Sequence, residues 1–376
     1  PRLVLSFDLE CDSCDGMFPQ FHRSGDSIIQ IGNTAHWYNH PDYPAKNGNE
    51  AQVVDQTIFV YPSAAPIPGV NVVNCKTEGM LIEKWAEYIE RLDPDDLTGY
   101  YIVGFDFEYI YRRAEMLGVT HALEKLHRVL DLEGGYEEKK MSSSAYGENV
   151  YKMLKMVGRN RIDLCKYIAR EYKLDSYKLN SVSQHFLGNE KVDLKYHLIF
   201  QKQHGTDADR AEIANYCIQD CRLCNHLMHK LDVLAATVGM SNVTRVPLEY
   251  LFVRGQGIKV FSQVADKCTE KGYLIKTLYP KEGGRGYVGA LVIEPETGFY
   301  SEPVTVMDFN SLYPNIMISE NISPDTKVTS SEFMDLPGYT YNTINHQTMD
   351  GEDKVITFAV DSSGERGVMP DILCTV

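Results

Sequence analysis

The sequence predicts an α/β unit that is followed by the opening part of an α+β unit. Three observations indicate this arrangement: apolar runs separated by turn residues begin the chain, helical stripes dominate its middle, and strand-like runs return from Ala290 onward. Strands and helices that come in such blocks are typical of separate packed units. The length of 376 residues is also long for one compact domain, so we expect two or three units.

The first part of the chain carries most of the expected sheet. Apolar runs bounded by turn residues predict strands, and their short spacing favours an antiparallel start to the sheet. These strands are expected at Leu3–Glu10, Ile28–Trp37, Thr57–Tyr61 and Tyr101–Phe105. Apolar residues at helical spacing predict helices at Glu78–Leu92 and Phe107–Leu117.

The later elements follow in a mixed order. A polar, Gly- and Ser-rich stretch at Glu133–Asn149 predicts a loop or a protruding hairpin, and helical signals dominate Ile162–Val238. The pattern continues with a helix at Arg254–Gly272, a flexible connector at Gly283–Gly286, and strands at Ala290–Glu294 and Thr305–Asp308.

The composition is that of a soluble globular protein, with 43% hydrophobic and 24% charged residues. No apolar run reaches the length that a bilayer requires and no signal peptide is visible, which predicts an intracellular protein with no membrane partner. The chain starts at Pro1 directly before a strand-like run and stops at Val376 without tapering. We therefore expect an internal fragment of a longer protein.

The nine cysteines argue for a reducing compartment rather than a disulfide framework. Cys11 and Cys14 form a CxxC, but no second pair follows at zinc spacing. Cys217, Cys221 and Cys224 fall at helical spacing. Zinc binding is one interpretation of either group, and buried structural thiols are the favoured one.

The net charge of −15 at first argues against DNA binding, because phosphate contacts need Lys and Arg. A metal-dependent nuclease, however, must concentrate carboxylates, and its metal ions supply the missing positive charge. The charge therefore does not exclude a nuclease.

Asp8 and Glu10 stand two residues apart in the first predicted strand, which places both on one face. Two like charges so close are costly unless a cation lies between them. Hard oxygen ligands suit Mg²⁺ or Mn²⁺. The alternative is a pair of solvated carboxylates on an edge strand.

Two further carboxylates and one tyrosine could belong to the same site. Asp106 follows the apolar run that ends at Phe105, where it could ligate a metal or serve as a helix N-cap. Tyr216 and Asp220 are four apart and share one face of a predicted helix. Asp220 could complete a metal site while the Tyr216 hydroxyl orients an attacking water. The alternative for Tyr216 is a half-buried ring on an ordinary amphipathic helix.

Asp308 begins the stretch Asp-Phe-Asn-Ser-Leu-Tyr-Pro-Asn-Ile, which ends at Ile316. The apolar run from Pro303 to Met307 predicts a buried strand before it, so Asp308 should stand at a strand end with a turn and a helix after it. A carboxylate in that place can hold a divalent cation beside a cleft. The ring and the proline that follow can shape a pocket for a planar or sugar-bearing substrate.

This stretch resembles motif A of the family B DNA polymerases. The upstream order Asp-x-Glu, Phe-Asp and Tyr-x-x-x-Asp resembles the three exonuclease motifs of the proofreading members of that family. The resemblance extends along nearly the whole chain, and the residues after the first motif look most like those of delta-type polymerases from large eukaryotic DNA viruses. Its further stretches are residues 158–164, 173–180, 254–259 and 287–290.

The resemblance implies a three-part organisation. Residues 1–235 would form a ribonuclease H-like 3′→5′ exonuclease domain, residues 236–300 a connecting helix and linker, and residues 301–376 part of an α+β polymerase palm. In the exonuclease domain, Tyr216 and the four carboxylates would be catalytic, with two Mg²⁺ or Mn²⁺ ions hydrolysing the phosphodiester. These metal ligands are Asp8, Glu10, Asp106 and Asp220.

In the palm, the resemblance implies that Asp308 and Phe309 contact metal and that Asp308 is catalytic. Substrate contacts are implied for Ser311, Leu312 and Tyr313, of which Tyr313 would lie under the sugar. The alternative for Tyr313 is core packing. Tyr287 and Gly289 of the YxGG/A element are likewise implied to contact the substrate, at the primer strand.

The implied partners are DNA, as primer-template and as a single-stranded 3′ end, and deoxynucleoside triphosphates in the full-length protein. A sliding clamp is a candidate partner, and the host nucleus or a cytoplasmic viral replication site is the implied location. One departure is Tyr101, which stands where the family usually has Asn. The triphosphate-binding helix and the second palm aspartate motif do not occur in these 376 residues, so we expect no primer extension by this piece alone.

Two other functions remain as alternatives. One is a stand-alone 3′→5′ DNA exonuclease, which would have no use for Ser311–Pro314. The other is an inactive DNA-binding scaffold, in which clustered unused carboxylates would be a liability.

Overall fold

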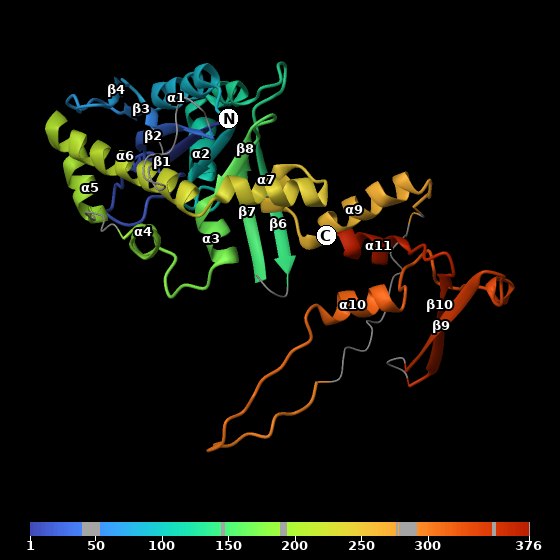
Figure 1. Ribbon diagram of the computed structural model, residues 1–376. Coiled ribbons are helices and arrows are strands. Elements are labelled where there is room, and N and C mark those ends of the chain that lie inside the picture. The colour runs from blue at the N-terminus through green and yellow to red at the C-terminus, as the bar shows by residue number, and fades with distance from the viewer. Residues whose placement is uncertain are drawn as a thin grey trace. The chain divides into compact units, whose positions relative to one another are not determined.

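The computed structural model describes residues 1–39, 53–143, 147–188, 194–275, 277, 292–347 and 351–375 (Figure 1). The chain forms two compact units. Unit one comprises residues 1–242 and 246–255, and unit two comprises residues 243–245 and 256–376. Among the described residues, the helices are all too short or too polar to cross a membrane.

Unit one is built on a six-stranded sheet with the order β4-β3-β2-β1-β5-β8. Strands β1, β2 and β3 pair antiparallel, which confirms the expected start of the sheet. Strand β5 lies parallel to β1 and β8, and β4 lies parallel to β3. The strands are β1 (Arg2–Cys11), β2 (Ile28–Tyr38), β3 (Val53–Val60), β4 (Asn71–Asn74), β5 (Asp96–Gly99) and β8 (Asn160–Asp163).

The expected strand at Tyr101–Phe105 is wrong, because these residues form a turn. The strand lies just before it, at β5, whose sequence is partly polar and carries a fully buried Asp96. Arg2 binds both carboxylate oxygens of Asp96, at 2.7 and 2.8 Å, and Asn160 of β8 donates to it as well. Cross-strand hydrogen bonds thus stabilise a strand that apolar periodicity does not reveal.

The helices begin at clear sequence signals. Thr77 caps α1 by accepting the backbone N–H of Met80 at 3.1 Å, and Thr206 with Asp209 forms a capping box at α6. The helices up to Val253 are α1 (Glu78–Leu92), α2 (Asp106–Leu117), the 3₁₀ helix η1 (Thr120–Leu126), α3 (Leu164–Glu171), α4 (Leu179–Leu187), α5 (Tyr196–Gln203), α6 (Asp207–Lys230), α7 (Val233–Thr244) and α8 (Leu248–Val253). The predicted helix at Glu78–Leu92 is confirmed at both ends.

The core of unit one forms around alternating residues of β1. Phe7 packs against Trp85 of α1 and Phe107 of α2, with ring centroids 5.4 Å apart in each case. The Trp85 indole donates to Asn33 of β2 at 3.0 Å, which satisfies its polar atom in the interior. One face of β1 is therefore committed to the core with α1 and α2, while α6 packs against β1 and β2.

A hairpin of β6 (Tyr136–Ser143) and β7 (Gly147–Leu154) extends from unit one (Figure 1). It confirms the protruding hairpin that the polar, Gly- and Ser-rich stretch allowed. The backbone N–H of Lys152 donates to Val103 at 3.0 Å, so the hairpin is tied to the turn that precedes α2.

Unit two contains a short helical core and a hairpin. Val264 and Cys268 of α9 pack with Val368 and Ile372 of α11. The elements are α9 (Gln256–Glu270), α10 (Leu312–Ser319), the 3₁₀ helix η2 (Ser331–Phe333), β9 (Tyr339–Gln347), β10 (Asp353–Asp361) and α11 (Val368–Thr375).

The strands expected at Ala290–Glu294 and Thr305–Asp308 are not formed among the described residues. Ala290 itself lies outside the described residues, and residues 292–308 have no regular structure. Val306 and Met307 are each 89% exposed, so the apolar run that predicted a buried strand has no partner surface in this part of unit two. A strand needs a neighbour to pair its backbone, and within the described residues none pairs with this run.

Candidate metal-binding active site

Two carboxylates project from one face of β1. Asp8 pairs with Gly32 of β2, and Glu10 pairs with Gln30. Because Phe7 faces the core, strand alternation places Asp8 and Glu10 on the opposite face. The Glu10 side chain is buried and that of Asp8 is half-buried. The two side chains share a face, as their spacing predicts.

Asp106 approaches this face from the start of α2. The helix cap is Phe105, which makes no side-chain capping bond, and Asp106 is the first residue inside the helix, so the N-cap interpretation is wrong. Its carboxylate accepts the backbone N–H of Leu9, which lies between the two acidic residues of β1. The side chain is only 3% exposed, and burial raises the pKa of Asp106 to about 7. This carboxylate is therefore seated directly on β1.

Asp220 comes from α6, and Tyr216 precedes it by one turn on the same helix. Asp220 is buried, whereas Tyr216 is partly buried against Ile29, Ile199 and Ile213. The packing of its ring agrees with the amphipathic alternative for Tyr216. The same packing would also hold the hydroxyl in a set direction.

The other three predicted carboxylates act electrostatically on Asp8. Burial raises the pKa of Asp8 well above its usual range, and the charges of Asp220, Asp106 and Glu10 raise it further. A divalent cation relieves such repulsion, and carboxylate oxygens are the ligands that Mg²⁺ and Mn²⁺ prefer. The donor set therefore fits the metal ions that the sequence predicts.

The tightest part of this site also contains a thiol. Ligand atoms of Asp8, Glu10 and Cys217 lie within 4.8 Å of one another, and no other such group of three was found in the part of the chain that the structure describes. Cys217 Sγ donates to the backbone oxygen of Asp8 at 3.5 Å. Burial raises the pKa of Cys217 well above its usual range, which keeps it a thiol at neutral pH. A thiol is a poor ligand for a hard cation.

An apolar pocket of about 390 Å³ adjoins the acidic residues, and Glu10 forms part of its wall. Phe18 and Phe105 contact each other edge to face, with ring centroids 5.3 Å apart. Met17, Phe18 and Tyr196 are between 64% and 67% exposed. Sequence periodicity does not predict this pocket, although the adjacent Met17 and Phe18 in a polar loop are a signal for it. Its other lining residues are Leu9, Cys11, Pro19, Ile199 and Phe200.

Tyr101 occupies a left-handed backbone conformation with φ of 68° in the turn before Asp106. Asn adopts the left-handed conformation more readily than Tyr does. For a residue such as Tyr, this conformation costs about 1–2 kcal/mol relative to the right-handed one. The ring lies across Gly104, where an added Cβ would collide with it, and the Lys166 ammonium lies 5.6 Å from its centroid. Gly104 thus leaves room for the Tyr101 ring and Lys166 contacts it, at the position where the resembled family usually has Asn.

The residues predicted for a second site lie in unit two or outside the described residues. Asp308 is exposed, Phe309 is 76% exposed and Tyr313 is 68% exposed. Ser311 precedes α10 in a left-handed conformation with φ of 49°, and Leu312 begins the helix. Within the described residues, no Asp, Glu, His or Cys joins Asp308 in a close metal-binding group. The predictions for Tyr287 and Gly289 lie outside the described residues.

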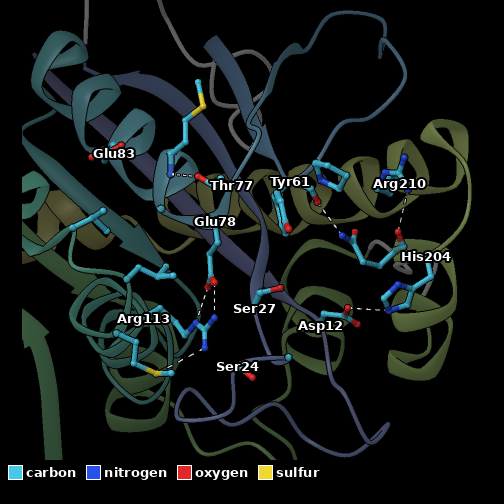
Figure 2. Close-up of a pocket in the computed structure, with 18 residues that line it drawn as sticks. Asp12, Ser24, Ser27, Tyr61, Thr77, Glu78, Glu83, Arg113, His204 and Arg210 are labelled. Atoms are coloured by element: carbon cyan, nitrogen blue, oxygen red, sulfur yellow. Dashed lines mark hydrogen bonds and ion pairs between the residues drawn. The ribbon is translucent and has the colours of Figure 1, made fainter.

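A larger hollow of about 950 Å³ in unit one is lined in part by polar side chains that contact one another (Figure 2). Arg113 binds Glu78 through two nitrogens at 2.7 and 2.5 Å, and His204 lies 3.0 Å from Asp12. Arg113 also donates to the backbone oxygens of Phe21 and Arg23. These contacts join the β1–β2 loop to α1 and α2, so the hollow marks a structural junction.

Comparisons with known proteins place two family models on the chain. The model described as DNA polymerase family B, exonuclease domain, matches residues 1–182, and the model described as DNA polymerase family B matches residues 246–376. Together they match part of unit one and most of unit two, leave residues 183–245 unmatched, and include every predicted carboxylate except Asp220.

Named relatives match almost the whole chain. A DNA polymerase of Pyramimonas orientalis virus is 39% identical over 93% of this chain and 34% of its own length. The DNA polymerase delta catalytic subunits of Dictyostelium discoideum and Bos taurus are 37% and 36% identical, over 99% of this chain and 32% of their lengths. The chain therefore spans about a third of the length of these relatives.

A solved structure shares the fold. The family B DNA polymerase from the hyperthermophilic archaeon Pyrobaculum calidifontis aligns with a TM-score of 0.62 and 23% identity, over 100% of this chain and 41% of that chain.

Proposed function

Because the chain belongs to the family B DNA polymerases, we propose that its first unit is a 3′→5′ exonuclease that hydrolyses DNA with two Mg²⁺ or Mn²⁺ ions. The arrangement supports a ribonuclease H-like unit, in which the central β1 carries two of the acids and α2 and α6 bring the others. Hydrolysis from a 3′ end would serve proofreading during DNA replication.

Each polar side chain has a role in this proposal. Asp8, Glu10, Asp106 and Asp220 would hold the ions, and bound ions would supply a water-derived nucleophile and neutralise the charge that develops on the phosphate. Tyr216 orients the attacking water with its hydroxyl, one helical turn before Asp220.

The observation that carries the proposal is that Glu10 belongs both to the acidic group and to the wall of the apolar pocket. If a nucleobase stacks on Phe18 and Tyr196, the phosphodiester of the same nucleotide would lie beside the carboxylates of the acidic group. Base stacking on aromatic side chains contributes about 1–3 kcal/mol per base and tolerates any sequence. Only an unpaired base can enter such a pocket, and a mismatched end needs the least energy to unpair.

Phe18→Ala is expected to raise KM for a single-stranded 3′ end by about 5- to 150-fold, because it removes one stacking surface worth about 1–3 kcal/mol. The value of kcat should change much less, since the carboxylates remain. Steady-state kinetics on a short oligonucleotide measure both. Leu130→Ala, at an apolar residue that is 86% exposed and does not line the pocket, is the control. Equal KM values for Phe18→Ala and the unmodified chain would contradict the role of the pocket.

A strand labelled at its 5′ end tests the proposed activity itself. With Mg²⁺, the unmodified chain should shorten it one nucleotide at a time from the 3′ end, and EDTA should stop the reaction. A terminal mismatch on a duplex should be removed faster than a paired end. Shortening of the strand in EDTA, or no shortening with Mg²⁺ or Mn²⁺, would rule the proposal out.

For the second unit we propose part of a polymerase palm, in a longer protein that extends a primer-template with deoxynucleoside triphosphates. Asp308 and Phe309 would contact metal there, and Ser311, Leu312 and Tyr313 the incoming nucleotide. The polymerase family model over residues 246–376 supports this proposal over a stand-alone exonuclease. The gathered carboxylates support it over an inactive scaffold. A sliding clamp remains a candidate partner of the longer protein.

A further inference from the structure

A sulfur atom lies directly beneath the acidic site. Cys217 is fully buried on α6, and its Sγ contacts the backbone oxygen of Asp8. Asp8 pairs with Gly32 of β2, and a Cβ added at Gly32 would lie 2.6 Å from Cys217 Sγ. Because Gly32 has no side chain, Cys217 Sγ has room to lie close to the Asp8 and Glu10 carboxylates.

The donor set around this point is mixed. Two carboxylate oxygens and one sulfur lie within 4.8 Å of one another. Ligand atoms bonded to a tetrahedral Zn²⁺ at about 2.0–2.3 Å are about 3.3–3.8 Å apart, so the three atoms need only a modest contraction to bind one ion. Carboxylates alone suit hard cations, whereas sulfur selects soft or borderline ones. Three protein ligands leave a fourth tetrahedral position for water. This set differs from the all-cysteine groups considered in the sequence, because only one of the three cysteines of α6 takes part.

We propose that Asp8, Glu10 and Cys217 form a binding site for a thiophilic divalent cation such as Zn²⁺, which competes with the magnesium of the nuclease. On binding, the S–H bond breaks, its proton passes to solvent, and a sulfur–metal bond forms without any redox change. The ion would occupy the Asp8 and Glu10 oxygens and lie displaced toward α6. The inhibitory consequence rests on the proposed nuclease function, whereas the binding itself does not.

Cobalt absorption tests the binding directly, because Co²⁺ replaces Zn²⁺ and shows a thiolate-to-cobalt charge-transfer band when sulfur ligates it. The unmodified chain should show this band at one equivalent of Co²⁺, and Cys217→Ser should lose it. Cys224→Ser is the matched control, because Cys224 is equally buried two turns further along α6 but lies outside the close group. It should retain the band. Thermal unfolding and a second variant, Cys217→Ala, separate ligand loss from misfolding.

Competition calorimetry gives the magnitude. Zn²⁺ should bind Cys217→Ser at least about 10-fold more weakly than the unmodified chain, the lower end of what even an outer-shell change costs a metal site. In the nuclease assay, Zn²⁺ should inhibit the unmodified chain and Cys224→Ser at similar concentrations. A cobalt band that persists in folded Cys217→Ser, or that never forms in the unmodified chain, would overturn the proposal. If the unmodified chain does not cleave DNA with Mg²⁺, the nuclease function fails, and the cobalt band still decides the site.

Discussion

Replacing Asp8 and Glu10 together by Ala should lower Mg²⁺-dependent hydrolysis of a DNA 3′ end by more than about 100-fold. The loss of an outer-shell partner alone costs a metal site about 10- to 100-fold, and these two residues are proposed as direct ligands. Single-turnover cleavage of a 5′-labelled oligonucleotide measures the rate. Mn²⁺ should not restore it, because the missing ligands serve both ions.

The same double variant should be at least as stable as the unmodified chain in EDTA. The pKa of Asp8 is raised in the folded chain, so its ionised form opposes folding, and stability is lost as pH rises through that raised pKa. Replacing Asp8 by Ala removes this carboxylate, so the variant should not lose folding stability in this way as pH rises. Thermal unfolding in EDTA at several pH values checks it. Cleavage by the folded variant within about 10-fold of the unmodified rate would contradict the assignment of these ligands.

Arg113→Met should cost about 3–5 kcal/mol of unfolding free energy, because it leaves Glu78 charged and buried without its partner. The side chains of this ion pair are only 3% and 6% exposed. The backbone oxygens of Phe21 and Arg23 lose a donor at the same time. The only two tryptophans, Trp37 and Trp85, both belong to unit one, so their fluorescence in urea reports on this unit.

Lys84→Ala is the matched control for this prediction. Lys84 pairs with Glu87 at 2.8 Å on the surface of α1, where both side chains are 42% exposed. Water screens such a pair, so its loss should lower the unfolding free energy far less than the loss of the buried pair does. Similar losses for Lys84→Ala and Arg113→Met would show that the buried pair does not stabilise unit one as argued.

Periodicity predicted the elements that bury an apolar face. The ends of α1 and the position of β2 follow from such patterns, because Leu81, Trp85 and Ile89 point into one core. Periodicity did not predict β5, because its Asp96 is a buried charged residue. That charge is stabilised by an ion pair with Arg2, which is distant in the sequence. Periodicity failed again at Val306 and Met307, since an apolar run becomes a strand only where another strand pairs with it.

Motif spacing predicted the acidic residues of the first site, and the charges of Asp220, Asp106 and Glu10 all raise the pKa of Asp8. Spacing could not reveal what surrounds them. The apolar pocket joins Phe18 in the β1–β2 loop with Tyr196 of α5, and the place of Cys217 depends on Gly32 of a different strand. Such neighbours are set by long-range packing, which a single sequence does not display.

Four carboxylates from β1, α2 and α6 are proposed to bind metal as one site. Calorimetric titration of Mn²⁺ into the unmodified chain and into Asp8→Asn, Glu10→Gln, Asp106→Asn and Asp220→Asn tests it most directly, because each substitution removes one charge at nearly constant volume. Each folded variant should bind Mn²⁺ at least about 10-fold more weakly than the unmodified chain or lose one equivalent of it. If any one of the four binds Mn²⁺ with unchanged affinity and stoichiometry, its carboxylate is not a ligand and the single shared site is contradicted.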